Sequence, residues 1–168
     1  MTDIIFKVGI LTVSDKGWRG ERGDRSGEVL RETLSGIDAH IINYDIVPDE
    51  KKLIAEKLIK WADEGKVDVI ITTGGTGLSP RDVTPEATLS VVDRVAPGFA
   101  ETMRAESLKK TPHAMLSRAV SGIRGSCLII NLPGSPKGAR ECLESILPAL
   151  PHAVETLRGQ GGECATPE

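Results

Sequence analysis

Aromatic residues and cysteine are scarce in this sequence, and positive charge is not in excess. The 168 residues include only two Trp, two Phe and one Tyr, too few for a surface that binds single-stranded nucleic acid by base stacking. The 21 Lys and Arg are outnumbered by 24 Asp and Glu, so that the formal net charge is −3. A general nucleic-acid binder usually has a surplus of cations to meet the phosphates. We therefore expect no nucleic-acid partner.

The three cysteines, Cys127, Cys142 and Cys164, are an odd number and form no CxxC pair. A disulfide framework and a cysteine-based zinc site are therefore both disfavoured. Long apolar runs are absent as well, since none approaches the roughly 20 residues that a helix needs to cross a bilayer. The first residues lack the layout of a signal peptide. We expect no membrane partner and a cytoplasmic location.

Signatures of a catalytic nucleophile are also missing. None of the three histidines lies near a serine or cysteine signature, and the zinc motif HExxH is absent. His113 could line a site, although an ordinary surface or packed imidazole is the simpler interpretation. There is no GxxxxGKS/T motif, and Pro80 stands where the third glycine of GxGxxG would be. An ordinary P-loop NTPase and an NAD enzyme are therefore disfavoured.

Short apolar runs alternate with amphipathic stretches along the chain. This alternation predicts an α/β fold in which a mainly parallel, Rossmann-like sheet lies between two layers of helices, a three-layer α/β/α sandwich. We expect residues 1–168 to form a single domain, with a flexible tail from about residue 159. The predicted strands are 6–13, 41–47, 67–73 and 127–132. The predicted helices are 26–34, 52–62, 84–95, the segment from the Pro97-Gly98 break to 109, 112–120 and 137–147.

Three of these helices begin with a capping signal. Ser26, Thr84 and Ser135 are the expected N-caps. Pro85 and Pro136 occupy the first helical positions, which favour proline.

The sharpest functional signal is the glycine-rich loop that follows the strand at 67–73. Gly74, Gly75 and Gly77 allow a backbone with positive φ, and the successive N–H groups of such a turn can surround an anion. Ligands of parallel sheets bind at the carboxyl ends of the strands, where this loop lies. The alternative is a tight turn without a ligand.

Asp49 and Asp82 each lie beyond a strand and just before a helix. Either could cap a helix or complete a turn. Both could instead hold Mg²⁺ beside a polyphosphate. The residues alone leave these roles evenly balanced, but the shared sheet edge favours a metal somewhat.

Cations gather in two further loops. Those at the start of the helix at 137–147 oppose the helix dipole, and a bound anion would offset this cost unless the side chains simply extend into water. The basic loop at 16–25 could close over phosphates, although a solvated charged loop is the better interpretation of that segment alone. Together, the loops favour phosphoryl or nucleotidyl transfer, in which positioning and charge neutralisation do most of the catalysis. The cations at the start of the helix 137–147 are Lys137 and Arg140, and those of the basic loop at 16–25 are Lys16, Arg19, Arg22 and Arg25.

Seven segments occur in an order and spacing that resemble the molybdopterin adenylyltransferase family, of the MogA/MoaB type and similar to the G domain of gephyrin. The resemblance covers about residues 6–158. The segments are 8–15 (VGILTVSD), 47–50 (VPDE), 73–77 (TGGTG), 79–86 (SPRDVTPE), 111–118 (TPHAMLSR), 122–125 (GIRG) and 131–136 (NLPGSP).

The resemblance implies a homotrimer of three-layer α/β subunits that uses ATP as co-substrate together with Mg²⁺. Members of the family transfer AMP to the terminal phosphate of molybdopterin and release pyrophosphate. The product is then passed on for insertion of molybdenum or tungsten, with a molybdopterin molybdenumtransferase as the expected recipient. A non-catalytic pterin-binding carrier or paralogue, and a trimeric scaffold, are the alternatives.

The resemblance also implies roles for individual residues, and it transfers none to the basic loop at 16–25. Asp49 and Asp82 are the expected catalytic and metal-binding carboxylates. The expected nucleotide-binding residues are Gly74, Gly75, Thr76, Gly77, Ser79, Pro80, Gly134 and Ser135. The expected pterin-binding residues are Ser14, Asp15, Ser107 and Ser117.

Overall fold

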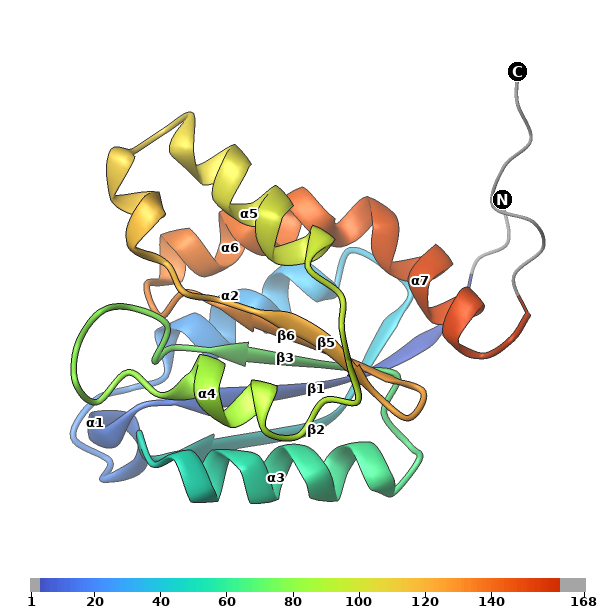
Figure 1. The fold of residues 1–168 in the computed structure, drawn as a ribbon, viewed down its shortest axis with the longest axis horizontal. Helices are drawn as coiled ribbons and strands as arrows, with labels where there is room; N and C mark the ends of the chain where they lie inside the picture. Colours follow the sequence, from blue (N-terminus) through green and yellow to red (C-terminus); the bar gives the residue numbers. More distant parts are fainter. Residues whose placement is uncertain (1–3, 161–168) are drawn as a thin grey trace.

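The computed structural model describes residues 4–160, so most of the predicted tail lies outside the described residues. A six-stranded sheet with the order β2-β1-β3-β6-β5-β4 forms its centre (Figure 1). Strands β2, β1, β3 and β6 are parallel, whereas β5 pairs antiparallel with both β6 and β4. The strands are β1 (Phe6–Val13), β2 (Ala39–Val47), β3 (Val69–Thr73), β4 (Arg94–Val95), β5 (Ser121–Arg124) and β6 (Cys127–Leu132).

Helices cover both faces of the sheet. The helices α2, α5, α6 and α7 pack on one face, and α3 and α4 pack on the other (Figure 1). The predicted three-layer α/β fold with a mainly parallel sheet is confirmed. No helix within residues 4–160 combines the length and the apolar composition that a membrane crossing requires. The α-helices are α1 (Asp15–Trp18), α2 (Arg25–Leu34), α3 (Lys51–Asp63), α4 (Thr84–Leu89), α5 (Gly98–Leu108), α6 (Pro136–Ile146) and α7 (Leu150–Leu157), and the 3₁₀ helices are η1 (Pro112–Leu116) and η2 (Leu147–Ala149).

The central strands are buried on both faces of the sheet. Every residue of β3 and of β6 is buried. Along β1, Phe6, Val8 and Ile10 contact the core under α2, α5, α6 and α7, whereas Leu11 and Val13 contact the core under α3 and α4. Burial on both sides explains why these strands are continuous apolar runs in the sequence.

The antiparallel edge of the sheet was missed by the sequence analysis. The predicted helix 84–95 ends at Leu89, and the chain then turns so that β4 pairs with β5. The predicted helix 112–120 is wrong in its second half, because only Pro112–Leu116 is helical, as a 3₁₀ turn. Strands of two and four residues are too short to show a period of two, so their pairing depends on tertiary contacts.

The start of α6 is as predicted, but the start of α2 is not. The hydroxyl of Ser135 accepts a hydrogen bond from the N–H of Gly138 at 3.1 Å and caps α6. Asp24, rather than Ser26, caps α2 by accepting from the N–H of Gly27 at 3.0 Å. The segment predicted as a loop before α2 contains the short helix α1.

Asn131 ties β6 to β3 and α4 from a fully buried position. Its amide nitrogen donates to the hydroxyl oxygens of Thr72 at 3.0 Å and Thr88 at 2.9 Å. Its amide oxygen accepts from the N–H of Val120 at 3.2 Å. The side chains of Asn131, Thr72 and Thr88 are all 0% exposed. A buried polar network of this kind stabilises only when its members are satisfied, so Asn131 helps to set how these elements pack.

The variant Asn131→Leu is expected to lower the free energy of unfolding by about 2–4 kcal/mol, because buried hydroxyl and N–H groups lose their partner. Urea-induced unfolding followed by circular dichroism measures the change. Asn43→Leu, on the edge strand β2, is the matched control and should change stability by less than about 0.5 kcal/mol. Equal effects of the two variants would contradict the role given to Asn131.

Candidate active site

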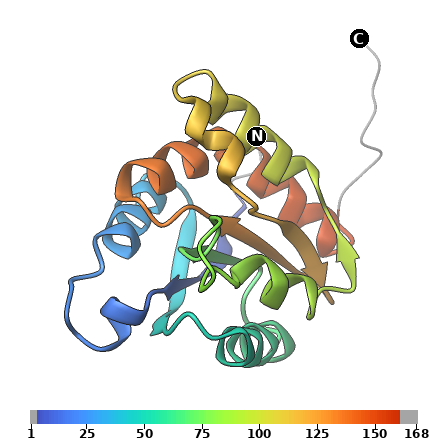
Figure 2. The ribbon, with the colours of Figure 1, turned by 60° about the vertical axis from the view of Figure 1, so that its left-hand side comes forward.

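The loops that follow β1, β2, β3 and β6 gather at one edge of the sheet (Figure 2). The four strands are parallel, so their carboxyl ends meet there. This is the edge at which open α/β sheets bind ligands. All four loops that the sequence analysis selected therefore come together.

The glycine-rich loop after β3 leaves no room for side chains at its first two positions. Gly74 and Gly75 have φ values of 102° and 68°, which non-glycine residues rarely adopt. A Cβ on Gly74 would collide with the carbonyl oxygen of Val13, and a Cβ on Gly75 with the hydroxyl of Thr84. Thr84 was predicted as the N-cap of α4, but Val83 holds that position. The Thr84 hydroxyl instead donates to the carbonyl oxygen of Gly74 at 2.9 Å and holds the loop.

The loop after β6 packs directly on the glycine-rich loop. A Cβ on Gly134 would lie 3.2 Å from the Cα of Gly74. The hydroxyl of Thr73 donates to the carbonyl oxygen of Pro133 at 2.8 Å, and the N–H of Gly74 donates to that of Leu132 at 3.1 Å. The two predicted nucleotide loops therefore form one structural unit.

Several backbone donors of this unit remain available for a ligand. Within residues 4–160, the N–H groups of Gly75, Thr76 and Gly77 donate no hydrogen bond to the protein, and neither do those of Gly134 and Ser135. Successive free N–H groups in a glycine-rich turn suit an anion. The geometry thus supports the anion interpretation over an empty tight turn.

Asp49 and Asp82 flank the glycine-rich loop. One carboxylate oxygen of Asp49 would lie 3.3 Å from a Cβ built on Gly75, and one of Asp82 would lie 2.8 Å from a Cβ on Gly77. Each carboxylate accepts one backbone hydrogen bond, Asp49 from Asp15 at 2.9 Å and Asp82 from Ser79 at 3.1 Å. The other oxygen of each carboxylate has no hydrogen-bond partner in the part of the chain that the structure describes.

The surroundings of Asp49 disfavour its negative charge. Burial raises the pKa of the Asp49 carboxyl, and the negative charges of Asp15 and Asp82 raise it further. Asp49 is also not the N-cap of α3, because Glu50 holds that position. A half-buried carboxylate close to two others is one whose charge a cation would stabilise.

Asp15 connects the loop after β1 with both Asp49 and Arg81, which precedes α4. Its carboxylate accepts two hydrogen bonds from the guanidinium of Arg81, at 2.6 and 2.9 Å, and one from the N–H of Asp49 at 3.0 Å. The bonds from Arg81 and Asp49 lower the pKa of the Asp15 carboxyl. Both oxygens of Asp15 are therefore occupied by the protein itself.

Arg118 was quoted within a motif by the sequence analysis, but it was given no role. Its guanidinium donates to the carbonyl oxygens of Gly77 at 2.8 Å and Asp82 at 2.6 Å, and it pairs with Glu86. Its backbone N–H donates to the carbonyl oxygen of Thr76 at 2.8 Å. One side chain thus holds both ends of the loop that carries Asp82. Nothing local in the sequence indicated this, since Arg118 is 32 residues or more from every partner.

A charged cavity of about 590 Å³ lies between the loops after β1, β3 and β6. Two arginines and three aspartates contribute to its walls. Its lining is Thr12, Val13, Ser14, Gly17, Arg22, Gly23, Asp24, Arg25, Ser26, Asp49, Thr73, Gly74, Gly75, Asp82, Gly134, Ser135 and Pro136.

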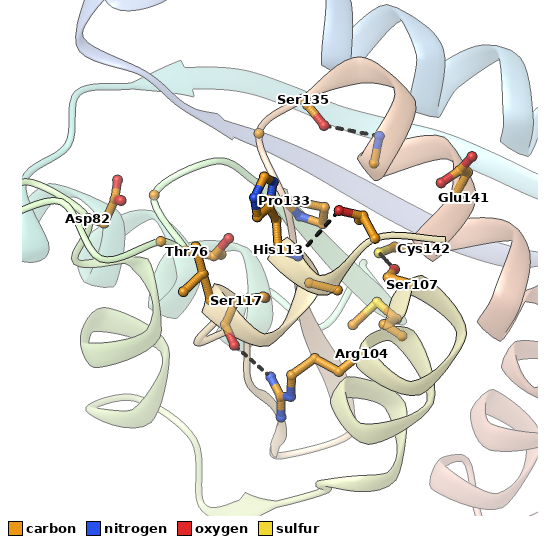
Figure 3. A pocket seen from close by; sticks show the side chains of 18 residues that line it. Thr76, Asp82, Arg104, Ser107, His113, Ser117, Pro133, Ser135, Glu141 and Cys142 are labelled. Atoms are coloured by element: carbon orange, nitrogen blue, oxygen red, sulfur yellow. Dashed lines mark hydrogen bonds between the residues drawn. The ribbon is translucent and has the colours of Figure 1, made fainter. Parts of the chain in front are cut away.

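An apolar cavity of about 470 Å³ lies on the other side of the glycine-rich loop, under α5 and η1. Figure 3 shows Asp82 at one end of it and Cys142 at the other. His113 is exposed and also lines this cavity, so that both of its predicted interpretations remain (Figure 3). Its lining is Gly75, Thr76, Gly77, Asp82, Met103, Arg104, Ser107, Thr111, His113, Ala114, Leu116, Ser117, Pro133, Gly134, Ser135, Gly138, Glu141 and Cys142.

The two cavities share one wall, which we call the junction: Gly75, Asp82, Gly134 and Ser135. A ligand that fills both cavities must pass these four residues. The junction therefore combines a carboxylate with free backbone donors. It suits a phosphate group that links a charged chain to a flat, apolar ring.

The four expected pterin-binding residues do not all line the same cavity. Ser107 and Ser117 line the apolar cavity, whereas Ser14 lines the charged one and Asp15 lines neither. The structure therefore does not bring the four expected pterin-binding residues together.

The two cations predicted to bind an anion at the start of α6 do not face either cavity. Lys137 and Arg140 line neither cavity, and Arg140 pairs with Glu32 at 3.0 Å. Ser79 and Pro80 also lie outside both linings. The residues of the loop before α6 that line both cavities are Gly134 and Ser135.

Comparison with known proteins places this arrangement in a family. Residues 9–152 match the family described as a probable molybdopterin binding domain. The chain belongs to this family. The resemblance identified from the seven segments is thereby confirmed.

Relatives within the family cover most of the chain. The molybdopterin adenylyltransferase of Helicobacter pylori (strain J99) is 48% identical over 154 residues, which are 90% of this chain and 88% of that protein. The molybdenum cofactor synthesis protein cinnamon of Drosophila melanogaster is 45% identical over 94% of this chain, but the match covers 26% of that longer protein. The crystal structure of the molybdopterin biosynthesis enzyme MoaB from Thermus thermophilus is 57% identical, with a TM-score of 0.87 over 92% of this chain and 97% of that one.

In Arg118→Gln, hydrogen exchange of the backbone amides in residues 77–86 is expected to become about 10- to 100-fold faster. Each lost charge-assisted hydrogen bond contributes about 1.5–3 kcal/mol, and local opening becomes easier by a similar amount. Mass spectrometry of exchanged peptides measures this. Arg124→Gln removes the arginine that pairs with Asp63 at 2.9 Å beside the start of β6, and it should leave exchange in 77–86 unchanged. Unchanged exchange in Arg118→Gln would show that Arg118 does not hold the loop.

Asp49→Asn is expected to raise the melting temperature at neutral pH. Because the pKa of Asp49 is raised in the folded state, its ionisation destabilises the fold as the pH rises through that pKa. The advantage of the variant should therefore vanish near pH 4 and grow towards pH 7. Asp63→Asn should show the opposite sign, since Arg124 lowers the pKa of Asp63. Thermal unfolding from pH 4 to 8 tests both, and a pH-independent difference for Asp49→Asn would contradict the charge argument.

Proposed function

We propose that this protein is a molybdopterin adenylyltransferase, which transfers AMP from ATP to the terminal phosphate of molybdopterin and releases pyrophosphate. The observation that carries the proposal is the junction, where a charged and an apolar cavity meet beside Asp82 and the free N–H groups of the glycine-rich loop. The name of the relative from Helicobacter pylori, a molybdopterin adenylyltransferase, supports the same activity.

The two cavities suggest how the substrates divide between them. The charged cavity suits the phosphate chain of ATP, and the apolar cavity suits the pterin ring. In this arrangement Ser107 and Ser117 face the pterin and Ser14 faces the nucleotide, whereas Asp15 lines neither cavity and instead holds Asp49 through backbone hydrogen bonds. The phosphate of molybdopterin then reaches the α-phosphate of ATP at the junction.

The reaction needs no nucleophile from the protein. A terminal phosphate oxygen of molybdopterin attacks the α-phosphorus, a new P–O bond forms, and the bond from the α-phosphorus to the bridging oxygen of the β-phosphate breaks. The free N–H groups of Gly75, Thr76 and Gly77 are placed to stabilise charge on the α-phosphate. Cys142 lines the apolar cavity, but burial raises the pKa of its thiol, which keeps it protonated. It is therefore unsuited to covalent catalysis.

Mg²⁺ fits the donors that Asp49 and Asp82 offer. Within residues 4–160, no group of three or more His, Cys, Asp and Glu side chains could hold a metal ion. Mg²⁺ that arrives with a nucleotide needs only one or two protein carboxylates, because phosphates and waters supply its other ligands. One oxygen of each carboxylate accepts no hydrogen bond from the residues that the structure describes. We therefore propose Asp49 and Asp82 as its ligands, with charge neutralisation of the phosphates as the chemistry that the ion supplies.

Further proposals rest on the family resemblance. A homotrimer, a single domain that spans the chain, a cytoplasmic location and transfer of the product to a molybdopterin molybdenumtransferase all stay predictions. Sedimentation analysis would test the trimer.

Asp49→Asn and Asp82→Asn should each reduce molybdopterin-dependent release of pyrophosphate from ATP and Mg²⁺ by at least about 100-fold, because each variant removes a proposed ligand of the Mg²⁺ that would neutralise the phosphates. A coupled pyrophosphate assay with and without molybdopterin measures this. Asp45→Asn is the matched control, since Asp45 pairs with Lys57 at 2.6 Å outside both cavities, and it should retain most of the activity.

The same assay separates the alternatives. Binding of molybdopterin without release of pyrophosphate by the unmodified protein would indicate a carrier or a paralogue without activity. Absence of both binding and release, with a trimer present, would favour a scaffold. Full activity of Asp49→Asn and Asp82→Asn would reject the proposed roles of the carboxylates while leaving the adenylyltransferase activity in place.

A further inference from the structure

The basic loop at 16–25, which runs from α1 to the first residue of α2, contributes two arginines to the charged cavity. Arg22 and Arg25 both line it, and neither lines the apolar cavity or the junction. Neither arginine forms an ion pair within residues 4–160. The guanidinium of Arg22 makes a long contact of 3.4 Å to the hydroxyl oxygen of Ser14. Two uncompensated guanidinium groups therefore face a cavity that also contains three aspartates.

Arg19 on the same loop behaves differently. It forms two hydrogen bonds to the carboxylate of Glu21, at 2.8 and 3.2 Å, and lies outside both cavity linings. The loop thus carries one arginine with an internal partner and two without. Only those without a partner face the cavity.

Asp24 fixes the position of the loop between the two free arginines. Its carboxylate accepts hydrogen bonds from the hydroxyl of Thr12 on β1 at 2.7 Å, from the hydroxyl of Tyr44 on β2, and from the N–H of Gly27 at 3.0 Å. Hydrogen bonds from the sheet and from the start of α2 therefore stabilise the negative charge of Asp24. Arg25 is the first residue of α2, where a positive charge opposes the helix dipole and a bound anion would offset that cost.

The position of these arginines identifies the part of the nucleotide that they would meet. If the pterin phosphate attacks from the apolar cavity, the α-phosphate lies at the junction. The leaving group of a phosphoryl transfer departs roughly opposite to the attacking oxygen. In this protein, that direction leads into the charged cavity, where Arg22 and Arg25 lie.

We propose that Arg22 and Arg25 bind the β- and γ-phosphates of ATP and stabilise the charge that develops on the departing pyrophosphate. The proposal rests on the proposed function for the direction of attack. It adds a polyphosphate site on the basic loop, to which the family resemblance assigned no role. Guanidinium groups suit this ligand because they can donate paired hydrogen bonds to phosphate oxygens.

The test is isothermal titration calorimetry of the full-length protein with ATP, AMP and inorganic pyrophosphate, each in the presence of Mg²⁺. Arg22→Gln and Arg25→Gln should each weaken binding of ATP and of pyrophosphate by about tenfold, the effect of one charge-assisted hydrogen bond. Binding of AMP should change by less than about twofold, since AMP lacks both phosphates. Arg22→Lys and Arg25→Lys should recover part of the loss.

Arg19→Gln is the matched control, because it removes the same charge from the same loop outside the cavity. It should leave the binding of all three ligands unchanged. An equal loss in Arg19→Gln would show a general effect of net charge and overturn the site. Equal losses for AMP and ATP would place the arginines at the α-phosphate instead, and unchanged ATP binding in the double variant Arg22→Gln/Arg25→Gln would also reject the proposal.

Different results would reject the adenylyltransferase and the polyphosphate site. Arginine-dependent binding of pyrophosphate without molybdopterin-dependent release from ATP would reject the adenylyltransferase and retain the polyphosphate site. Release of pyrophosphate that persists at the unmodified rate in the double variant would retain the adenylyltransferase and reject the role of the arginines in departure of the leaving group. An unmodified protein that binds neither ATP nor pyrophosphate would overturn both.

Discussion

The close approach of two backbones, at Gly74 and Gly134, is the constraint on which the rest of the site depends. A Cβ on Gly134 would lie 3.2 Å from the Cα of Gly74, and Gly74 has a φ of 102°. Because the turns after β3 and β6 touch, their free N–H groups line one junction rather than two separate loops. The parallel pairing of β3 with β6 brings the turns to the same edge, and the lack of side chains lets them meet there.

The electrostatics of the site depend on the same arrangement. Asp49 and Asp82 flank the glycine-rich loop, and Asp15 lies against Asp49, so three negative charges share a small volume. Arg81 compensates Asp15, and Arg118 holds the backbone at Asp82. Asp49 forms no ion pair within residues 4–160, and its pKa is raised by burial and by its acidic neighbours despite the charge of Arg81. The protein thus keeps a charge that costs folding stability, as functional sites commonly do.

The fold and much of the site could be predicted from the sequence because their signals are local. The apolar runs of β1, β3 and β6 indicated buried parallel strands, and each of these strands is present. Ser135 was recognised as a cap because its side chain acts three residues away. The contacts made by Arg118 and Asp15 could not be predicted in this way. Their partners are 32 or more residues distant, and any cation or carboxylate in a polar loop would have shown the same local pattern.

By itself, the sequence determined the four parallel strands and the main helices that follow them, the glycine positions at which the chain can turn tightly, and the family to which the protein belongs. These follow from hydrophobic periodicity, from the freedom of glycine and from motifs in a fixed order. Only the tertiary structure decided that β4 and β5 form one edge of the sheet. It also decided that Ser14 and Ser107 line different cavities, and that two arginines of the basic loop face the charged cavity. The physical reason is that these features depend on which distant segments pack together. Pairing across the sheet and contacts between loops leave no periodic trace along the chain.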